Sequence, residues 1–185
     1  MKKEDIRRSV RASKTLLSDA DKESAAASVF ARLEELAAFM MADHILMYHS
    51  LPDELSTRNF LDKWGNRKRF YLPRVNGVNL EILPYDRSHL HLGNFHIEEP
   101  DGTETVSVDN MEMIIVPAVA YDTRGNRVGR GKGYYDRLLK TSKALKVGVG
   151  YDFQLIDEIE SEEHDVPVDI VITQSRTIML RKSRI

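Results

Sequence analysis

Apolar positions near the amino terminus repeat at helical spacing. From Lys3 to about Leu17 they recur at three- and four-residue steps with basic residues between them, which predicts a first helix. Ser18, followed by Asp19 and Asp21, is typical of a helix N-terminus, because a hydroxyl caps free amides and carboxylates favour the positive end of the dipole. The next helix has one apolar face that is expected to lie in the core: Val29, Leu33, Leu36, Ala37 and Met40.

After Asp43 the pattern changes to short apolar runs separated by turns. Six runs predict strands, at 44–48, 70–73, 80–83, 113–116, 147–149 and 170–172. Helical stretches alternate with several of them, from Thr57 to Trp64, from Tyr134 to about Ala144 and from Gln154 to about Ile159. The segment from Tyr85 to Asp109 breaks this rhythm and is expected to form loops and short strands.

The alternation of strands and helices predicts an α/β fold. We expect a mainly parallel sheet with mixed edges, covered by helices on both faces in a Rossmann-like three-layer arrangement. No repeat, low-complexity tract or linker interrupts the 185 residues, so we expect a single domain over 1–185.

Composition excludes several classes of protein. The 42% hydrophobic content argues against a disordered chain, and no apolar run approaches the ~18 residues of a membrane-spanning helix. The absence of cysteine excludes disulfides, thiolate metal sites and cysteine nucleophiles. The charged amino terminus does not resemble a signal peptide, which predicts a cytoplasmic location. A net charge of −2 argues against a broad nucleic-acid or membrane surface, although 27 cations can still form a local patch.

The most informative segment runs from the end of an apolar strand into a helix, at 116–137. Gly129, Gly131 and Gly133 alternate there with Arg130 and Lys132. Glycines let the backbone approach a ligand closely, and a helix N-terminus offers unpaired amides, so the segment suits an anion such as a phosphate. The alternative is an exposed glycine-rich hairpin whose charges are only solvated.

Two known phosphate-binding patterns do not fit this segment. In a Walker A loop a hydroxyl residue follows the lysine, where this chain has Gly133, and Gly125 lies one residue too far from Gly131. In the Rossmann fingerprint the third glycine comes one residue later than it does here. The segment therefore predicts a phosphate-binding loop of another type.

The segment resembles the family of 5-formyltetrahydrofolate cyclo-ligase, also called methenyltetrahydrofolate synthetase. Residues 125–136 match the family's run Gly-x-Arg-Leu-Gly-x-Gly-Lys-Gly-Tyr-Tyr-Asp, with Val128 in place of leucine. The chain departs from the family at Ile6, where leucine is usual, and at His49, where a larger apolar residue is usual. Further agreements are Lys3-x-x-x-Arg7, Tyr48-x-Ser50-x-x-x-Glu54, Pro73-Arg74, Gly93-x-Phe95-x-Ile97-x-Glu99-Pro100 and Asp165-x-Pro167-x-Asp169.

The resemblance implies a ligase of one-carbon metabolism. Such enzymes convert 5-formyltetrahydrofolate to 5,10-methenyltetrahydrofolate with ATP and Mg²⁺, releasing ADP and phosphate. By analogy, the formyl oxygen attacks the γ-phosphate and the neighbouring folate nitrogen then closes the ring. This chemistry needs no enzyme nucleophile, which agrees with the absence of cysteine.

The resemblance also implies roles for individual residues. Arg130 and Lys132 would be catalytic, and Asp136 and Asp165 would hold Mg²⁺. The ATP site would consist of Lys3, Arg7, Arg127, Val128, Gly129, Arg130, Gly131, Lys132, Gly133, Tyr134 and Tyr135. The folate site would consist of His49, Glu54, Arg130, Gly131, Lys132, Gly133 and Tyr134.

Simpler interpretations stay open for some of these residues. Lys3 and Arg7 could form a solvated basic helix end, Asp136 could only favour the helix dipole, and His49 could be structural. Tyr134 and Tyr135 could pack partly into the core. Three further residues are weaker candidates: Arg74 for the phosphate or the folate glutamate, and Tyr151 and Gln154 for the cleft wall.

Two other functions compete with this interpretation. A phospho-sugar isomerase or transferase could use the basic glycine loop without ATP or Mg²⁺. An RNA-binding module is disfavoured, because the cations are confined and aromatic residues are not interleaved along a platform. We therefore expect small-molecule substrates, no nucleic-acid or membrane partner, and a monomer or weak oligomer.

Overall fold

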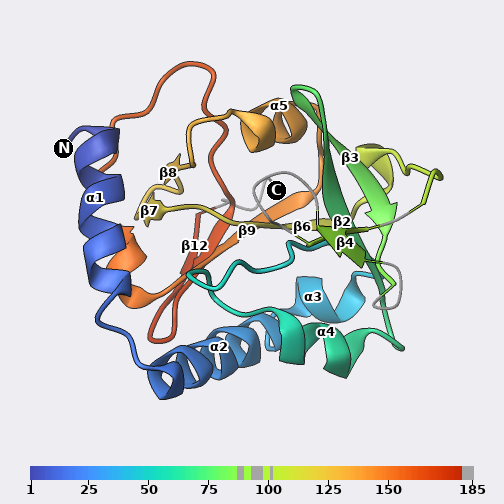
Figure 1. Ribbon diagram of the computed structural model, residues 1–185, viewed down its shortest axis with the longest axis horizontal. Coiled ribbons are helices and arrows are strands. Elements are labelled where there is room, and N and C mark those ends of the chain that lie inside the picture. Colours follow the sequence, from blue (N-terminus) through green and yellow to red (C-terminus); the bar gives the residue numbers. More distant parts are fainter. Residues whose placement is uncertain (87–89, 93–97, 101, 181–185) are drawn as a thin grey trace.

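A seven-stranded sheet forms the centre of the computed structural model, which describes residues 1–86, 90–92, 98–100 and 102–180 (Figure 1). From one edge to the other its strands are β12 (Thr177–Met179), β11 (Ile170–Ile172), β9 (Leu145–Val149), β6 (Met113–Val116), β1 (His44–Leu46), β2 (Arg69–Asn76) and β3 (Asn79–Pro84). Neighbouring inner strands pair in parallel, while β12 and β3 pair antiparallel at the two edges. This confirms the predicted sheet and all six predicted strands.

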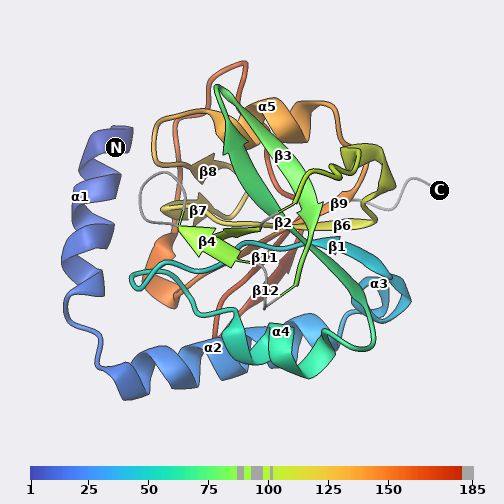
Figure 2. The same cartoon turned by 45° about the vertical axis from the view of Figure 1, so that its right-hand side comes forward.

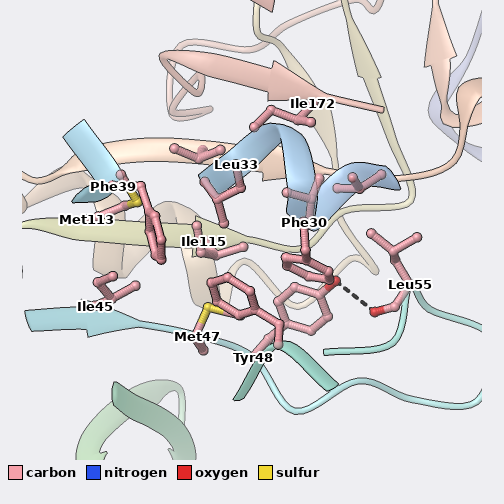
Figure 3. Close-up of a cluster of buried hydrophobic side chains, with 14 of the residues drawn as sticks. Phe30, Leu33, Phe39, Ile45, Met47, Tyr48, Leu55, Met113, Ile115 and Ile172 are labelled. Atoms are coloured by element: carbon pink, nitrogen blue, oxygen red, sulfur yellow. Dashed lines mark hydrogen bonds between the residues drawn. The ribbon is translucent and has the colours of Figure 1, made fainter. Parts of the chain in front are cut away.

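Three helices cover one face of the sheet: α2 (Asp19–Glu34), α3 (Ala37–Met41) and α4 (Arg58–Trp64), seen along the lower side in Figures 1 and 2. Figure 3 shows Phe30, Leu33 and Phe39 from these helices packed with strand residues such as Ile45 and Ile115. Ser18 caps α2 as predicted, since its hydroxyl accepts from the Asp21 amide and the Asp21 carboxylate accepts from the Ser18 amide.

The opposite face carries α5 (Tyr134–Lys140) and a second sheet, in the order β10 (Leu155–Ile156), β7 (Ala120–Asp122) and β8 (Arg127–Val128). The first helix, α1 (Lys3–Lys14), packs on this small sheet through Ile6 and Val10. Helices therefore lie on both faces of the central sheet, which confirms the predicted three-layer α/β fold.

The segment predicted as loops and short strands contains β4 (Leu90–Leu92), β5 (Glu98–Pro100) and a 3-10 turn, η2 (Val108–Asn110). The family-like residues Gly93, Phe95 and Ile97 lie outside the described residues. In the part of the chain that the structure describes, no helix is long and apolar enough to cross a membrane.

The second predicted helix is shorter than its apolar spacing indicated. The second helix ends at Glu34, and Leu36 adopts an extended conformation before α3 begins. The residues of α3 therefore face other directions than a continued helix would give them. Phe39 therefore points into the core, while Ala37 and Met40 are exposed.

The helix predicted from Gln154 does not form. A 3-10 turn, η3 (Asp152–Gln154), leads directly into β10, which pairs with β7. The Gln154 side chain accepts from the Tyr151 amide and donates to the carbonyls of Ala118 and Val119, so it fixes the turn rather than continuing a helix. The helix predicted from Tyr134 does form, but it ends at Lys140.

The strand order creates a switch point beside the centre of the sheet. The chain leaves β1 towards β2 on one side and leaves β6 towards β9 on the other side. Open α/β sheets bind ligands at the carboxyl ends of strands where crossovers diverge in this way. The fold therefore marks the loops after β1 and β6 as the place for a site.

Candidate functional site

A cleft of about 690 Å³ opens at this switch point. The loops after β1 and β6 form its floor, and the β2–β3 hairpin, the glycine loop 129–133 and the start of α1 form its walls. Of the residues predicted for the ATP, folate, catalytic and metal roles, all except Val128 line it: Lys3, Arg7, His49, Glu54, Arg127, Gly129, Arg130, Gly131, Lys132, Gly133, Tyr134, Tyr135, Asp136 and Asp165.

The glycine loop passes along the cleft in a conformation that favours glycine. Gly131 has a φ of 105° and Gly133 has a φ of 71°, both in the left-handed region. Arg137 holds the loop in place by donating from Nε to the Val78 carbonyl at 2.8 Å and from Nη2 to the Lys132 carbonyl at 2.9 Å. The loop is thereby tied to the tip of the β2–β3 hairpin, and Lys132 lies at the exposed mouth of the cleft.

The first helix contacts the glycine loop directly. Arg7 donates from Nε to the Gly129 carbonyl at 2.9 Å, and Lys3, one turn earlier, lies on the same cleft. The hydrophobic contacts of Ile6 and Val10 with the small sheet hold α1 in this place. The two cations are therefore built into the cleft wall and do not form merely a solvated helix end.

A buried ion pair joins the two ends of the glycine segment. Arg127 is 7% exposed and donates from Nη2 to Asp136 Oδ1 at 2.9 Å, and the Val166 amide donates to the same oxygen at 3.1 Å. The Arg127 guanidinium also lies 5.8 Å from the ring centre of Tyr135. Its buried Nε has no hydrogen-bond partner among the described residues. Asp136 is thus fixed at the edge of the cleft by more than the helix dipole.

Asp165 is held in place by the start of α1. Lys3 Nζ donates to Asp165 Oδ2 at 2.8 Å, and the Glu162 amide donates to the same oxygen at 2.9 Å. Burial alone would raise the pKa of Asp165, but the hydrogen bond from Lys3 and the further contacts lower it overall. The carboxylate is therefore ionised at neutral pH, as a metal ligand must be.

Two residues beside Asp165 belong to the cleft although they were not predicted. His164 Nε2 lies 3.1 Å from Glu162 Oε2 and 3.4 Å from Asp165 Oδ1. One ligand atom from each of these three residues lies within 4.8 Å of the others, a spacing that could hold a cation. The only signal in the sequence is the acidic run 157–165, which by itself is typical of an exposed loop.

Glu54 lies deep in the cleft, in the turn that follows β1. Its Oε1 accepts from the Leu51 amide at 2.9 Å, and its side chain is 14% exposed. Burial raises the pKa of Glu54. His49, from the same loop, also lines the cleft. These residues offer a hydrogen-bonding floor next to Arg130, whose Nη2 lies 3.8 Å from Glu54 Oε2.

An apolar wall adjoins this floor and was not predicted. Pro73 and Val75 of β2 and Leu80 of β3 form it, and Pro117 and Ala118 after β6 add apolar area to the floor. Such a wall suits a flat ring system, because apolar area is removed from water on both partners. The alternation of residues along these strands could have predicted that Pro73 and Val75 share one face of the sheet, but not that this face lines the cleft.

Several weaker candidates do not reach the cleft. Arg74 lies between Pro73 and Val75 on β2, so its side chain points to the other face, where it binds Glu81 Oε2 at 2.8 Å and the Gly102 carbonyl at 2.7 Å. Tyr151 and Gln154 are buried and absent from the lining, so the prediction that they line the cleft is wrong.

Val128, expected in the ATP site, also lies apart from the lining. Its side chain is buried in the cluster formed with Ile6 and Val10. Alternation explains this placement, because Arg127 and Gly129 on either side of it both line the cleft.

Comparison with known proteins agrees with this geometry. Residues 1–174 match the 5-formyltetrahydrofolate cyclo-ligase family. The chain is similar to 5-formyltetrahydrofolate cyclo-ligase from Escherichia coli K12, at 33% identity over 147 residues that cover 74% of this chain and 81% of the relative. It is also similar to the Haemophilus influenzae 5-formyltetrahydrofolate cyclo-ligase, at 28% identity over 182 residues that cover 92% of this chain and 97% of the relative.

A solved structure shows the same likeness over the whole chain. The NMR structure of Aquifex aeolicus 5,10-methenyltetrahydrofolate synthetase is 33% identical and superimposes with a TM-score of 0.90, covering 100% of this chain and 96% of the other. The family match, the sequence relatives and the fold thus agree, and the chain belongs to the 5-formyltetrahydrofolate cyclo-ligase family.

Proposed function

We propose that this enzyme converts 5-formyltetrahydrofolate to 5,10-methenyltetrahydrofolate, consuming ATP with Mg²⁺ and releasing ADP and phosphate. The observation that carries the proposal is the meeting of three features in one cleft: the glycine loop, the cations of α1 and the buried Glu54. A volume of about 690 Å³ lies within the usual range of small-molecule sites. The names of the relatives support the same activity.

The triphosphate would bind along the glycine loop. Glycines at positions 129, 131 and 133 leave the backbone open to a close approach, and Lys3, Arg7 and Lys132 supply positive charge around it. Arg127 would act mainly through Asp136, because its guanidinium is buried against that carboxylate. The two tyrosines after the loop would close the end of this site.

The folate would bind against the floor and the apolar wall. A carboxylate such as Glu54 suits a pterin, whose amino group and ring N–H groups donate hydrogen bonds. Pro73, Val75 and Leu80 would pack against the flat part of the substrate. This orientation would place the formyl group beside Glu54, on the side of the cleft where the glycine loop carries Arg130 and Lys132.

The chemical problem is that the formyl group is an amide, with a weakly electrophilic carbon and a poor leaving group. In the proposed reaction the formyl oxygen attacks the γ-phosphorus, and the bond from that phosphorus to ADP breaks. The neighbouring nitrogen then attacks the activated carbon, loses its proton, and the carbon–oxygen bond breaks with release of phosphate. Arg130 and Lys132 would stabilise the charge on the transferring phosphoryl group, so catalysis rests on positioning and electrostatics.

The cleft contains two carboxylates that would hold the Mg²⁺ of this proposal. Asp136 and Asp165 both line it, and the pKa of Asp165 is lowered overall, which favours the ionised form that a metal ligand needs. Bound there with ATP, the ion would neutralise phosphate charge.

We also infer that residues 1–185 act as one domain built on the seven-stranded sheet. The cytoplasmic location and the monomeric or weakly oligomeric state stay predictions.

The test of this function is the loss of turnover in Lys132→Ala. Lys132 is exposed, so the variant should keep its unfolding temperature, while the loss of one charge at a transferring phosphoryl group should lower kcat by about 10²–10³-fold. Lys143→Ala, at another exposed lysine outside the cleft, is the matched control and should keep full activity. Unchanged turnover in Lys132→Ala would refute the assignment of the loop lysine.

The phospho-sugar alternative makes a different prediction. Such an enzyme would be stabilised against heat by sugar phosphates and not by ATP with Mg²⁺. We expect the opposite result, because the cleft joins the phosphate-binding loop to a hydrogen-bonding floor and an apolar wall suited to a pterin.

A further inference from the structure

A series of charged contacts connects α1 to the glycine loop outside the cleft. Lys14, in the last turn of α1, has its Nζ 3.6 Å from Asp53 Oδ2. Asp53, in the loop after β1, also lies within 3.3 Å and 3.4 Å of Arg130 Nη2 through its two carboxylate oxygens. Neither Lys14 nor Asp53 lines the main cleft, so neither is expected to touch a substrate there.

Arg130 lies between two adjacent carboxylates. Its Nη2 is closer to Asp53 than to Glu54, whose Oε2 is 3.8 Å away. The side chain of Arg130 is half-exposed, so few packing contacts restrain it and its position depends on these charges. Without Asp53, the guanidinium would move onto Glu54 and occupy the oxygen that the proposed function gives to the folate.

Lys14 makes Asp53 a firm anchor. The Lys14 side chain is only 10% exposed, and α1 is held by the buried Ile6 and Val10. Burial lowers the pKa of Lys14, and the neighbouring Asp53 carboxylate opposes that shift, which favours the charged ammonium. Burial would raise the pKa of Asp53, but Lys14 and Arg130 lower it overall, so Asp53 is ionised at neutral pH.

We propose that Asp53, anchored by Lys14, is a positioning residue that holds Arg130 away from Glu54 and directs it to the transferring phosphoryl group. The proposal rests on the proposed function, because it assigns Glu54 to the folate and Arg130 to the phosphate. It links three segments that are distant in the sequence: the end of α1, the loop after β1 and the glycine loop.

The first test is Asp53→Asn, with kinetics measured separately for both substrates. The value of kcat/KM for 5-formyltetrahydrofolate should fall about tenfold, because a misplaced catalytic group and an occupied Glu54 both act on that step. The KM for ATP should change less than about twofold, since Lys3, Arg7 and Lys132 are untouched. The proposal would be contradicted if the KM for ATP changed as much as the KM for 5-formyltetrahydrofolate, or if kcat/KM for 5-formyltetrahydrofolate did not fall.

Variants of Lys14 separate positioning from simple loss of structure. Lys14→Met should lower kcat/KM for 5-formyltetrahydrofolate less than Asp53→Asn does. Lys14→Arg should keep the wild-type value, because a cavity of about 120 Å³ beside Lys14 and Asp53 has room for the larger cation. The matched control is Asp5→Asn, which breaks the exposed Asp5–Arg8 pair at 3.8 Å on the same helix and should change nothing. A loss of activity in Lys14→Arg as large as that in Lys14→Met would contradict the anchoring role.

A double-mutant cycle shows whether Asp53 acts through Arg130. If it does, Asp53→Asn should cause no further loss of activity, and no further weakening of 5-formyltetrahydrofolate binding by calorimetry, in an Arg130→Ala background. Losses that multiply would overturn the proposal. An inactive wild-type protein would instead refute the proposed function, so the two failures are distinguishable.

Discussion

The buried pair of Arg127 and Asp136 offers a quantitative test of how the glycine segment is held. In Arg127→Met the methionine keeps much of the side-chain volume but leaves the Asp136 carboxylate without its ion-pair partner. Removing one partner of a buried pair costs about 3–5 kcal/mol, and since the Asp136 side chain is 21% exposed, we expect the lower end, about 3 kcal/mol.

This loss is large enough to measure by thermal unfolding. A chain of this size loses about 2–4 °C in Tm for each kcal/mol, so Arg127→Met should unfold about 6–12 °C below the wild type. The matched control is Arg124→Met, three residues earlier, whose exposed side chain lies 4.0 Å from the exposed Glu158 and should shift Tm by no more than about 2 °C.

A double variant checks the physical cause. Arg127→Met combined with Asp136→Leu removes the stranded charge, so at least half of the lost Tm should return. A drop no larger than that of Arg124→Met would refute the argument that the pair is buried and structural. Failure of the double variant to recover would show that the loss comes from packing against Tyr135 and not from the charge.

Three further predictions concern other parts of the fold and cleft. Gly125→Ala should lower Tm at least twice as much as Gly77→Ala, because both residues have positive φ but a Cβ at Gly125 would lie 2.4 Å from the Val168 carbonyl oxygen, whereas the space at Gly77 is open. Arg74→Ala should leave the KM values for folate and ATP within about twofold of wild type by steady-state kinetics, since Arg74 points away from the cleft; a larger change would place it in the site. Burial raises the pKa of Glu54, and under the proposed function its ionised form would bind the pterin, so the KM for 5-formyltetrahydrofolate should rise as the pH falls through that raised pKa. A pH profile with no such acid limb, or one retained in Glu54→Gln, would contradict the assignment.

Much of the site could be predicted because its signals are local in the sequence. The alternation of glycine with Arg130 and Lys132 predicted a loop whose backbone a ligand can approach closely, and this loop lines the cleft, with Gly131 and Gly133 at positive φ. Lys3 and Arg7 are one helical turn apart, so their shared face followed from helix geometry alone. The parallel sheet followed from the alternation of strands and helices.

The remaining features depend on where the chain ends its elements and on contacts across the fold. The strand predicted at 70–73 extends to Asn76, so Arg74 lies inside a strand and alternation turns it away from the cleft. Leu36 breaks a helix whose apolar spacing runs on through Met40, because the chain there turns to bury Phe39. Asp53 contacts Lys14 and Arg130, which come from segments distant in the sequence, so no local sequence pattern could predict these contacts.

The central claim is most directly tested by following methenyltetrahydrofolate formation by absorbance with 5-formyltetrahydrofolate, ATP and Mg²⁺ together. We predict product only when all three are present, with one ADP released per product and no turnover when ATP is replaced by an analogue with a non-hydrolysable bond to the γ-phosphate. Product formed at the same rate without ATP, or no product with the complete mixture, would contradict the account.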